Sequence, residues 1–187
     1  MIGLALVHHP VRDGKGDTIA SALTNIDVHD IARTTRTFGG ERLYAVTPIS
    51  AQQELVHRIR GHWLDGAGKE RIPARAKAIE RVFPAASLDE AIEDFGRLAG
   101  RAPRVWATAA NPRGHETIAF AEARAVLAAE PTLLVFGTAH GLADEAIDRG
   151  HERQPLHDER PQARRQAASA RREGRDDVFM YAGTNDP

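Results

Sequence analysis

The 187-residue chain contains no cysteine. This absence excludes disulfide bonds, thiolate zinc sites, iron–sulfur clusters and cysteine nucleophiles together. Aromatic residues make up only 5% of the sequence, and no apolar run approaches the roughly 20 residues that a membrane-spanning helix needs. The N-terminal residues also lack the basic segment and cleavage site of a signal peptide. The sequence therefore predicts a cytoplasmic protein with no membrane partner.

An excess of charge is also missing, because 25 basic residues face 26 acidic ones. The chain as a whole has no field that would hold nucleic acid, so any such binding needs a local patch. Residues 57–81 are the one candidate, with seven lysines or arginines against three acidic residues. The hydrophobic content of 42% and charged content of 27% are typical of a globular domain.

Short apolar runs alternate with helical patterns over the first 148 residues. The predicted strands are residues 4–7, 42–47, 104–108 and 132–136. Helices are predicted around residues 28–38, from Ser50 to Trp63, from Ser87 to Leu98, and over 120–129. Ser50 is the expected N-cap of the second of these helices, and Ser87 to Glu90 is expected to form a capping box at the start of the third. Residues 72–86 give only a weak pattern of a short helix and a strand. This alternation predicts an α/β domain with a mostly parallel sheet and helices on both faces.

The composition changes after Asp148. Residues 149–177 contain eight arginines, six acidic residues and one large apolar side chain, Leu156. Such a segment cannot bury much core. We therefore expect residues 1–148 to form one domain and residues 149–187 to form a divergent, arginine-rich and poorly ordered tail, with a short apolar island at residues 178–181.

The most apolar predicted strand, residues 133–136, leads into a turn that contains Gly137 and Gly141. A turn of this kind at the carboxyl edge of a parallel sheet is a typical ligand-binding position. The alternative is a tight turn that needs glycine only for its backbone conformation. The acidic Asp144 and Glu145 that follow would repel phosphate and favour a cationic ligand.

Several blocks of the sequence, taken together, resemble one family. They are residues 7–11 (VHHPV), 24–34 (TNIDVHDIART), 46–48 (VTP), 61–63 (GHW) and 136–145 (FGTAHGLADE). They are similar to the small bacterial S-adenosylmethionine-dependent RNA methyltransferases of the SPOUT (α/β-knot) superfamily, over about residues 2–148. The resemblance implies a trefoil-knot fold, S-adenosyl-L-methionine as cofactor, tRNA or rRNA as partner, and a homodimer.

The resemblance also implies two cofactor-binding segments, with contacts made mostly by the backbone. The cofactor-binding residues are expected to be Thr108, Ala109, Ala110, Phe136, Gly137, Thr138, Gly141 and Leu142.

Asp27 and Arg33 are similar in spacing to the first motif of ribose-methylating relatives, in which an asparagine stands six residues before an arginine. They are the expected catalytic residues, with Arg33 gripping a phosphate or helping to deprotonate the attacking hydroxyl. Asp27 replaces the asparagine, so the methylated atom, on ribose or on a base, stays open. The alternative is that Asp27 caps the helix and Arg33 is simply solvated.

RNA binding is expected in the basic segment, at Arg58, Arg60, Lys69 and Arg71, where each phosphate contact would make affinity fall with salt. The alternative is an ordinary solvated helix face. No metal-ligand spacing occurs. His8 and His9 alternate at a strand end, which indicates capping or packing roles.

The resemblance ends near Asp148, where no counterpart of the family's last strand, third cofactor loop and final helix is visible. A shifted reading frame and a lineage-specific tail are two explanations of this ending. Loss of the final helix predicts a weakened dimer. It also keeps a second function open, that of a non-catalytic RNA- or cofactor-binding protein of the same fold.

Overall fold

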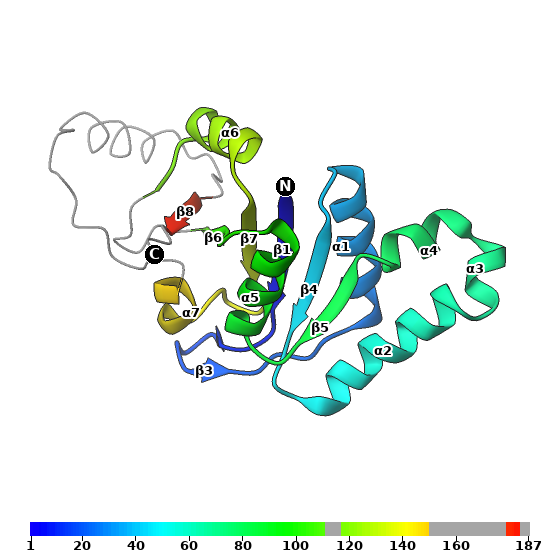
Figure 1. Ribbon diagram of the computed structural model, residues 1–187. Coiled ribbons are helices and arrows are strands. Elements are labelled where there is room, and N and C mark those ends of the chain that lie inside the picture. Colours follow the sequence, from blue (N-terminus) through cyan, green and yellow to red (C-terminus); the bar gives the residue numbers. More distant parts are fainter. Residues whose placement is uncertain (111–116, 150–178, 184–187) are drawn as a thin grey trace, which may run out of the picture.

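A six-stranded sheet forms the centre of the protein in the computed structural model, which describes residues 1–110, 117–149 and 179–183 (Figure 1). The strand order is β5-β4-β1-β7-β6-β8. The strands are β1 (Ile2–Val7), β4 (Arg42–Val46), β5 (Val82–Ala85), β6 (Arg104–Ala109), β7 (Thr132–Gly137) and β8 (Phe179–Gly183). Five of them are parallel and β8 runs antiparallel to β6. The predicted α/β fold with a mostly parallel sheet is confirmed.

Helices cover both faces of this sheet, as Figure 1 shows. The helices are α1 (Asn25–Thr37), α2 (Ser50–Leu64), α3 (Ala67–Arg71), α4 (Pro73–Ile79), α5 (Leu88–Ala99), α6 (Phe120–Ala129) and α7 (Asp144–Arg149). A short antiparallel pair, β2 (Val11–Arg12) and β3 (Thr18–Ile19), follows β1. Side chains alternate along each strand, so Tyr44 and Val46 pack with α5 and α7, whereas Leu43 and Ala45 pack with α1, α2 and α4.

The start of α1 differs from the expected one. Thr24 is the N-cap, and its hydroxyl accepts a hydrogen bond from the Asp27 amide. The Asp27 carboxylate in turn accepts the Thr24 amide at 3.0 Å, which completes a capping box. The alternative in which Asp27 itself is the N-cap is therefore wrong. The other end agrees with the sequence, because Gly39 has φ +75° directly after the helix.

Two further caps were predicted only in part. Ser87 caps α5 by accepting the Glu90 amide at 3.1 Å, but the Glu90 carboxylate accepts the Ala86 amide, so the reciprocal half of a capping box is displaced by one residue. Ser50 is the first residue of α2 and Ile49 occupies the N-cap position without a side-chain bond. The expected N-cap role of Ser50 is therefore wrong.

Strand β7 lies in the middle of the sheet, between β1 and β6. Leu133 and Val135 are fully buried on the α5 face, whereas Leu134 and Phe136 on the other face are half-buried. The central position is confirmed, but burial is complete on one face only.

The C-terminal residues contribute one strand to this sheet. The apolar island predicted at residues 178–181 overlaps β8, in which Phe179 pairs with Ala109. The rest of the predicted tail, residues 150–178 and 184–187, lies outside the described residues, so the expected division into a domain and a tail stays a prediction. Among the residues that the structure describes, no helix has the length and apolar character needed to cross a membrane.

Arg60 fastens α2 to the edge strand β5. Its Nη1 donates to the carbonyl oxygens of Ile79, Glu80 and Val82, and its guanidinium carbon lies 4.4 Å from the centroid of the Phe83 ring. This distance is within the range of a cation–π interaction, which stabilises the side chain in addition to the three hydrogen bonds. The side chain therefore has a structural role, whatever part it takes in RNA binding.

We predict that Arg60→Ala lowers the free energy of unfolding by about 1–3 kcal/mol, because charge-assisted hydrogen bonds to partly buried carbonyl groups are lost. Arg58→Ala is the matched control, since Arg58 is exposed on the same helix, and we expect a change within about 0.5 kcal/mol. Urea unfolding measures both variants. Equal stability of the two would contradict the structural role of Arg60.

Candidate functional site

The two predicted cofactor segments meet at the carboxyl edge of the sheet. Strands β6 and β7 are neighbours, with Ala107 paired with Val135, so the residues that follow each strand emerge side by side. The Thr108 hydroxyl donates to the Val135 carbonyl at 3.1 Å and ties the strand ends together. The structure thus brings Thr108–Ala110 and Phe136–Thr138 to one place.

The residues at this edge differ in exposure. Ala109 and Phe136 are half-buried and Ala110 is exposed. The main chain of β6 pairs with β7 on one side and, as far as Ala109, with β8 on the other. The exposed Ala110 and the apolar Phe136 ring are therefore the groups at this edge that a ligand can reach. A ligand with a flat, hydrogen-bonding ring suits such an edge.

The turn after β7 is held by the arm that contains β2 and β3. The Arg12 amide donates to the Gly141 carbonyl at 2.9 Å, and the His140 amide donates to the Arg12 carbonyl at 3.0 Å. The Arg12 guanidinium also forms an ion pair with Asp144. The positive charge of Arg12 compensates the negative charge of Asp144, which was expected to repel phosphate. Asp144 therefore gives less support to a cationic ligand than the sequence suggested.

Gly137 and Gly141 are required by the turn itself. A Cβ atom on Gly137 would lie 2.5 Å from the Leu142 amide nitrogen and 2.8 Å from the Gly141 carbonyl carbon. Gly141 has φ +98°, and the intervening Ala139 has φ +51°. The conformational explanation of these glycines therefore holds whether or not a ligand approaches. Because the contacts are with backbone, Gly137→Val would distort the turn, and it is unsuitable as a test of ligand binding alone.

A buried polar network connects this turn to the ends of two other strands. The Thr138 hydroxyl donates to the Val7 carbonyl at 3.0 Å and lies 2.5 Å from the Ser21 hydroxyl. Ser21 is in turn 3.0 Å from Nδ1 of His8, which is fully buried. The Ser21 carbonyl accepts the Gln52 side chain, so the start of α2 joins the same network.

Burial determines the protonation state of His8. The Ser21 hydroxyl has two acceptors for its single proton, the His8 carbonyl at 3.4 Å and the Thr138 hydroxyl at 2.5 Å. Nε2 of His8 has no hydrogen-bond partner among the described residues. Burial lowers the pKa of His8, and the smaller opposing effects are the charge of Asp27 and the carbonyl of Ala22. His8 is therefore neutral at pH 7.

Sequence reasoning anticipated a packing role for His8 but missed Ser21 and the network. The partners Ser21 and Thr138 are 117 residues apart, and no local pattern marks a serine in a short arm.

The predicted catalytic residues lie apart from one another on α1. Arg33 is six positions after Asp27 on the helix, so the two side chains point about 120° apart around the helix axis. Asp27 is occupied by the Thr24 cap. Arg33 pairs with Asp30 at 2.5 Å, where both side chains are exposed. Exposed pairs of this kind are weak, so a substrate phosphate can displace Asp30.

The predicted RNA-binding residues divide into two groups. Arg58, Lys69 and Arg71 are exposed. Arg60 is engaged with three carbonyl groups, as described above. All three bonds are made by Nη1, so a contact with RNA through Nη2 or Nε would not need to break them.

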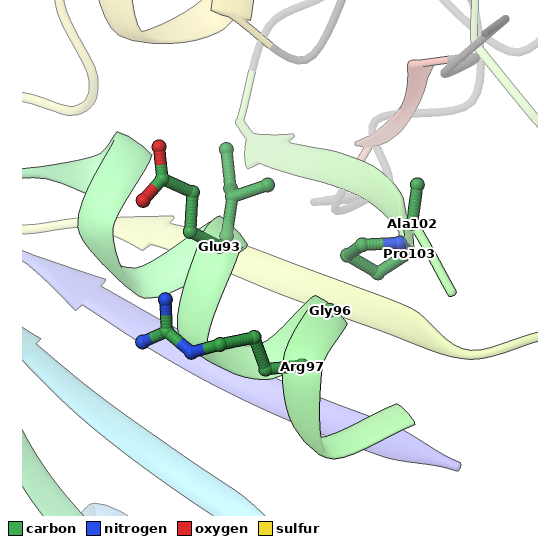
Figure 2. Close-up of a pocket in the computed structure, with 6 residues that line it drawn as sticks. Glu93, Gly96, Arg97, Ala102 and Pro103 are labelled. Carbon is green, nitrogen blue, oxygen red and sulfur yellow. The ribbon is translucent and has the colours of Figure 1, made fainter. Parts of the chain in front are cut away.

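Two cavities in the described chain lie elsewhere. One, of about 360 Å³, is lined by the outer side of α5 and by Ala102 and Pro103 before β6 (Figure 2). Because those residues precede β6, this cavity is at the opposite edge of the sheet from Thr108. The other, of about 230 Å³, is lined by Tyr44, Arg42 and Asp94 among others. There the Asp94 carboxylate accepts from Tyr44 at 2.7 Å and pairs with Arg42, which joins α5 to β4.

Comparison with known proteins gives a family model described as "SAM-dependent RNA methyltransferase", which matches residues 1–155. The chain belongs to this family. It is 41% identical over 145 residues to a "tRNA (guanine-N(1)-)-methyltransferase" of Oleidesulfovibrio alaskensis, and 41% identical over 144 residues to the protein of the same name in Nitratidesulfovibrio vulgaris. It is also 33% identical over 147 residues to an uncharacterized protein of Aquifex aeolicus.

These alignments cover different shares of the relatives. Each covers 77–78% of this chain. They cover 34% and 33% of the two tRNA methyltransferases, so the chain spans about a third of the length of those relatives, and 71% of the Aquifex protein.

The residues at the carboxyl edge fit part of S-adenosylmethionine, the cofactor of this methyltransferase family. Its adenosine needs main-chain donors and acceptors on an apolar surface. The exposed main chain at Ala110 and the half-buried Phe136 ring supply these features. The hydroxyl groups of Thr108 and Thr138 are committed to Val135 and Val7. Backbone groups and Phe136 are therefore the parts of this edge that fit the cofactor, whereas the two threonines shape the loops.

We predict that His8→Asn is more stable than His8→Gln by about 1 kcal/mol at pH 7.5. An asparagine amide lies at the position of Nδ1, where it can donate to Ser21 or accept from it, whereas a glutamine amide reaches the position of Nε2. Chemical denaturation of both variants measures the difference. A glutamine variant at least as stable as the asparagine variant would mean that the bond to Ser21 contributes nothing.

The same histidine predicts a pH dependence of stability. The unfolded chain binds a proton at His8 near pH 6.5, whereas the folded chain binds it only at lower pH. Stability from the neutral ring is therefore complete above pH 6.5 and decreases as the pH falls below that value. Melting temperatures between pH 7.5 and 5.5 should decrease less for His8→Asn than for the parent. The remaining decrease is expected from His29, whose pKa is also lowered, first by burial and then by Arg75.

Proposed function

We propose that this protein is an S-adenosylmethionine-dependent RNA methyltransferase that acts on tRNA. The observation that carries the proposal is the meeting of Thr108–Ala110 with Phe136–Thr138 at the carboxyl edge of neighbouring parallel strands, in a chain that belongs to an RNA methyltransferase family. The names of the two longer relatives support tRNA as the RNA class.

Family membership and strand order also support a SPOUT-type architecture. In the proposed fold, the chain after α7 threads a loop to form the trefoil knot around the cofactor. The bonds of the β2–β3 arm to Gly141 and His140 fit a crowded arrangement of this kind. A crystal structure that includes residues 150–178 with S-adenosylmethionine bound would test the threading.

The cofactor, when bound, supplies an activated methyl group. The protein contributes position and proton transfer. Arg33 is exposed and pairs weakly with Asp30, so it is suited to hold an RNA phosphate. Asp27, whose carboxylate accepts two hydrogen bonds from Thr24, is proposed to accept the proton that the methylated atom loses. Arg58, Lys69 and Arg71 supply further cations for the RNA backbone.

Calorimetry with S-adenosylmethionine and transfer of labelled methyl groups to unfractionated tRNA test the function. We expect micromolar binding, methylation of tRNA over rRNA, and at least tenfold weaker cofactor binding in Phe136→Ala. Leu98→Ala is the control, since Leu98 is 41% exposed near the end of α5. Cofactor binding without methyl transfer would favour the non-catalytic alternative, and no binding by the parent would overturn the proposed site.

A homodimer is proposed as well. Helix α1 exposes Ile26 by 71% near its start and Phe38 by 78% just after its end, and contact with a second copy would remove this apolar surface from water. We expect sedimentation velocity at micromolar concentrations to show a reversible monomer–dimer equilibrium that Ile26→Ser shifts toward monomer. A tight dimer that does not dissociate on dilution would contradict the expected weakening.

A further inference from the structure

Three side chains from three helices lie around Trp63 and belong to none of the predicted cofactor segments. The ring centroids of His29 and His62 lie 5.5 Å and 5.3 Å from that of Trp63, each at nearly a right angle. The guanidinium carbon of Arg75 lies 5.4 Å from the same centroid. We call His29 of α1, His62 and Trp63 of α2, and Arg75 of α4 the Trp63 cluster.

Positive charge converges on this cluster. Burial lowers the pKa of His29, and Arg75, Arg33 and His62 lower it further. Asp30 is the one group that acts in the opposite direction, and its carboxylate already pairs with Arg33. The arginines disfavour protonation of the half-buried His29, and an anion bound beside them would offset that effect.

Arg75 differs from the other half-buried arginines. In the described part of the chain, the rest have a carboxylate or carbonyl partner. These are Arg12, Arg42, Arg60, Arg81 and Arg104. The Arg75 side chain makes no hydrogen bond or ion pair with any described residue, and its Nε is buried without a partner. The Nδ1 atom of His29, in the same cluster, is also buried and unpartnered.

We propose that the Trp63 cluster binds a backbone phosphate of the RNA substrate, an inference that rests on the proposed function. A guanidinium and a protonated imidazole both donate to phosphate oxygens, and the guanidinium can do so through two parallel bonds. Trp63 holds Arg75 by cation–π contact and so orients it before RNA arrives. The exposed Lys69 and Arg71 of α3, which follows α2 directly, extend the same path for the RNA backbone.

RNA binding at the Trp63 cluster should depend on pH, unlike binding at a patch of lysines and arginines alone. A phosphate placed on the cluster offsets the charges of Arg75 and Arg33 that disfavour protonation of His29. RNA binding therefore takes up protons, and by linkage the affinity increases as the pH falls. The groups that face His29 are Asp30 and Arg33 on its own helix, His62 on α2 and Arg75 on α4.

Binding of unfractionated tRNA, followed by fluorescence anisotropy at pH 6.0 and 8.0 over a series of salt concentrations, tests the proposal. We expect Arg75→Gln to weaken binding about tenfold and to reduce the salt slope by about one. Lys77→Gln is the matched control, because Lys77 is exposed two residues further along the same helix. It should change the affinity less than threefold.

His29→Asn separates the proton linkage from charge alone. This variant should lose at least half of the gain in tRNA affinity that the parent shows between pH 8.0 and pH 6.0. Equal effects of Arg75→Gln and Lys77→Gln, or an unchanged pH dependence in His29→Asn, would overturn the phosphate site. Melting curves of each variant show whether the fold is retained.

S-adenosylmethionine affinity, measured on the same samples, distinguishes this inference from the proposed function. If the parent binds cofactor and methylates tRNA while Arg75→Gln leaves tRNA binding unchanged, the inference fails and the function stands. If tRNA binding depends on Arg75 but cofactor binding is absent, the phosphate site stands and the enzyme function fails.

Discussion

The carbonyl group of Val7 holds the turn after β7 in place at the candidate site. It accepts both the amide and the hydroxyl of Thr138, at 3.1 Å and 3.0 Å, and so joins the end of β1 to the turn after β7. Through Ser21 the same hydroxyl is linked to His8 and to the start of α2. His8 is buried and its partners are half-buried, so the hydrogen bonds among them stabilise one arrangement of the loops.

Backbone contacts between the two ends of this turn, and between the turn and the β2–β3 arm, also stabilise this arrangement of the loops. The space that a Cβ on Gly137 would fill is already occupied by the Leu142 amide, and the β2–β3 arm binds Gly141 and pairs Arg12 with Asp144. The edge that faces a ligand is therefore formed before any ligand binds. Preformed backbone of this kind reduces the entropic cost of holding a flexible cofactor.

Arginine serves two purposes in the basic segment, and only the structure separates them. Arg60 satisfies carbonyl groups at the end of α4 and on β5, and Arg81 donates to the Gly40 carbonyl. Arg75 rests on Trp63 and has no such partner among the described residues. The charge of the segment counts these three arginines equally, because the sequence does not show which of them lie close to a carbonyl group.

The sequence by itself determined the alternation of the main strands and helices, since burial imposes a period of two on strands and of 3.6 on helices. The helix at residues 120–129 and the strand that begins at Arg104 follow from that pattern alone. The pattern did not show the β2–β3 pair or α3, and it was weak for α4 and β5. The family resemblance placed the two predicted cofactor segments after two strands, and the structure shows that these strands are neighbours. Tertiary structure decided which polar side chains meet: Ser21 with Thr138, Arg60 with Val82, and Arg75 with Trp63. The physical reason is that hydrogen bonds and charge contacts act over a few ångströms in space, and periodicity along the chain carries no information about those distances.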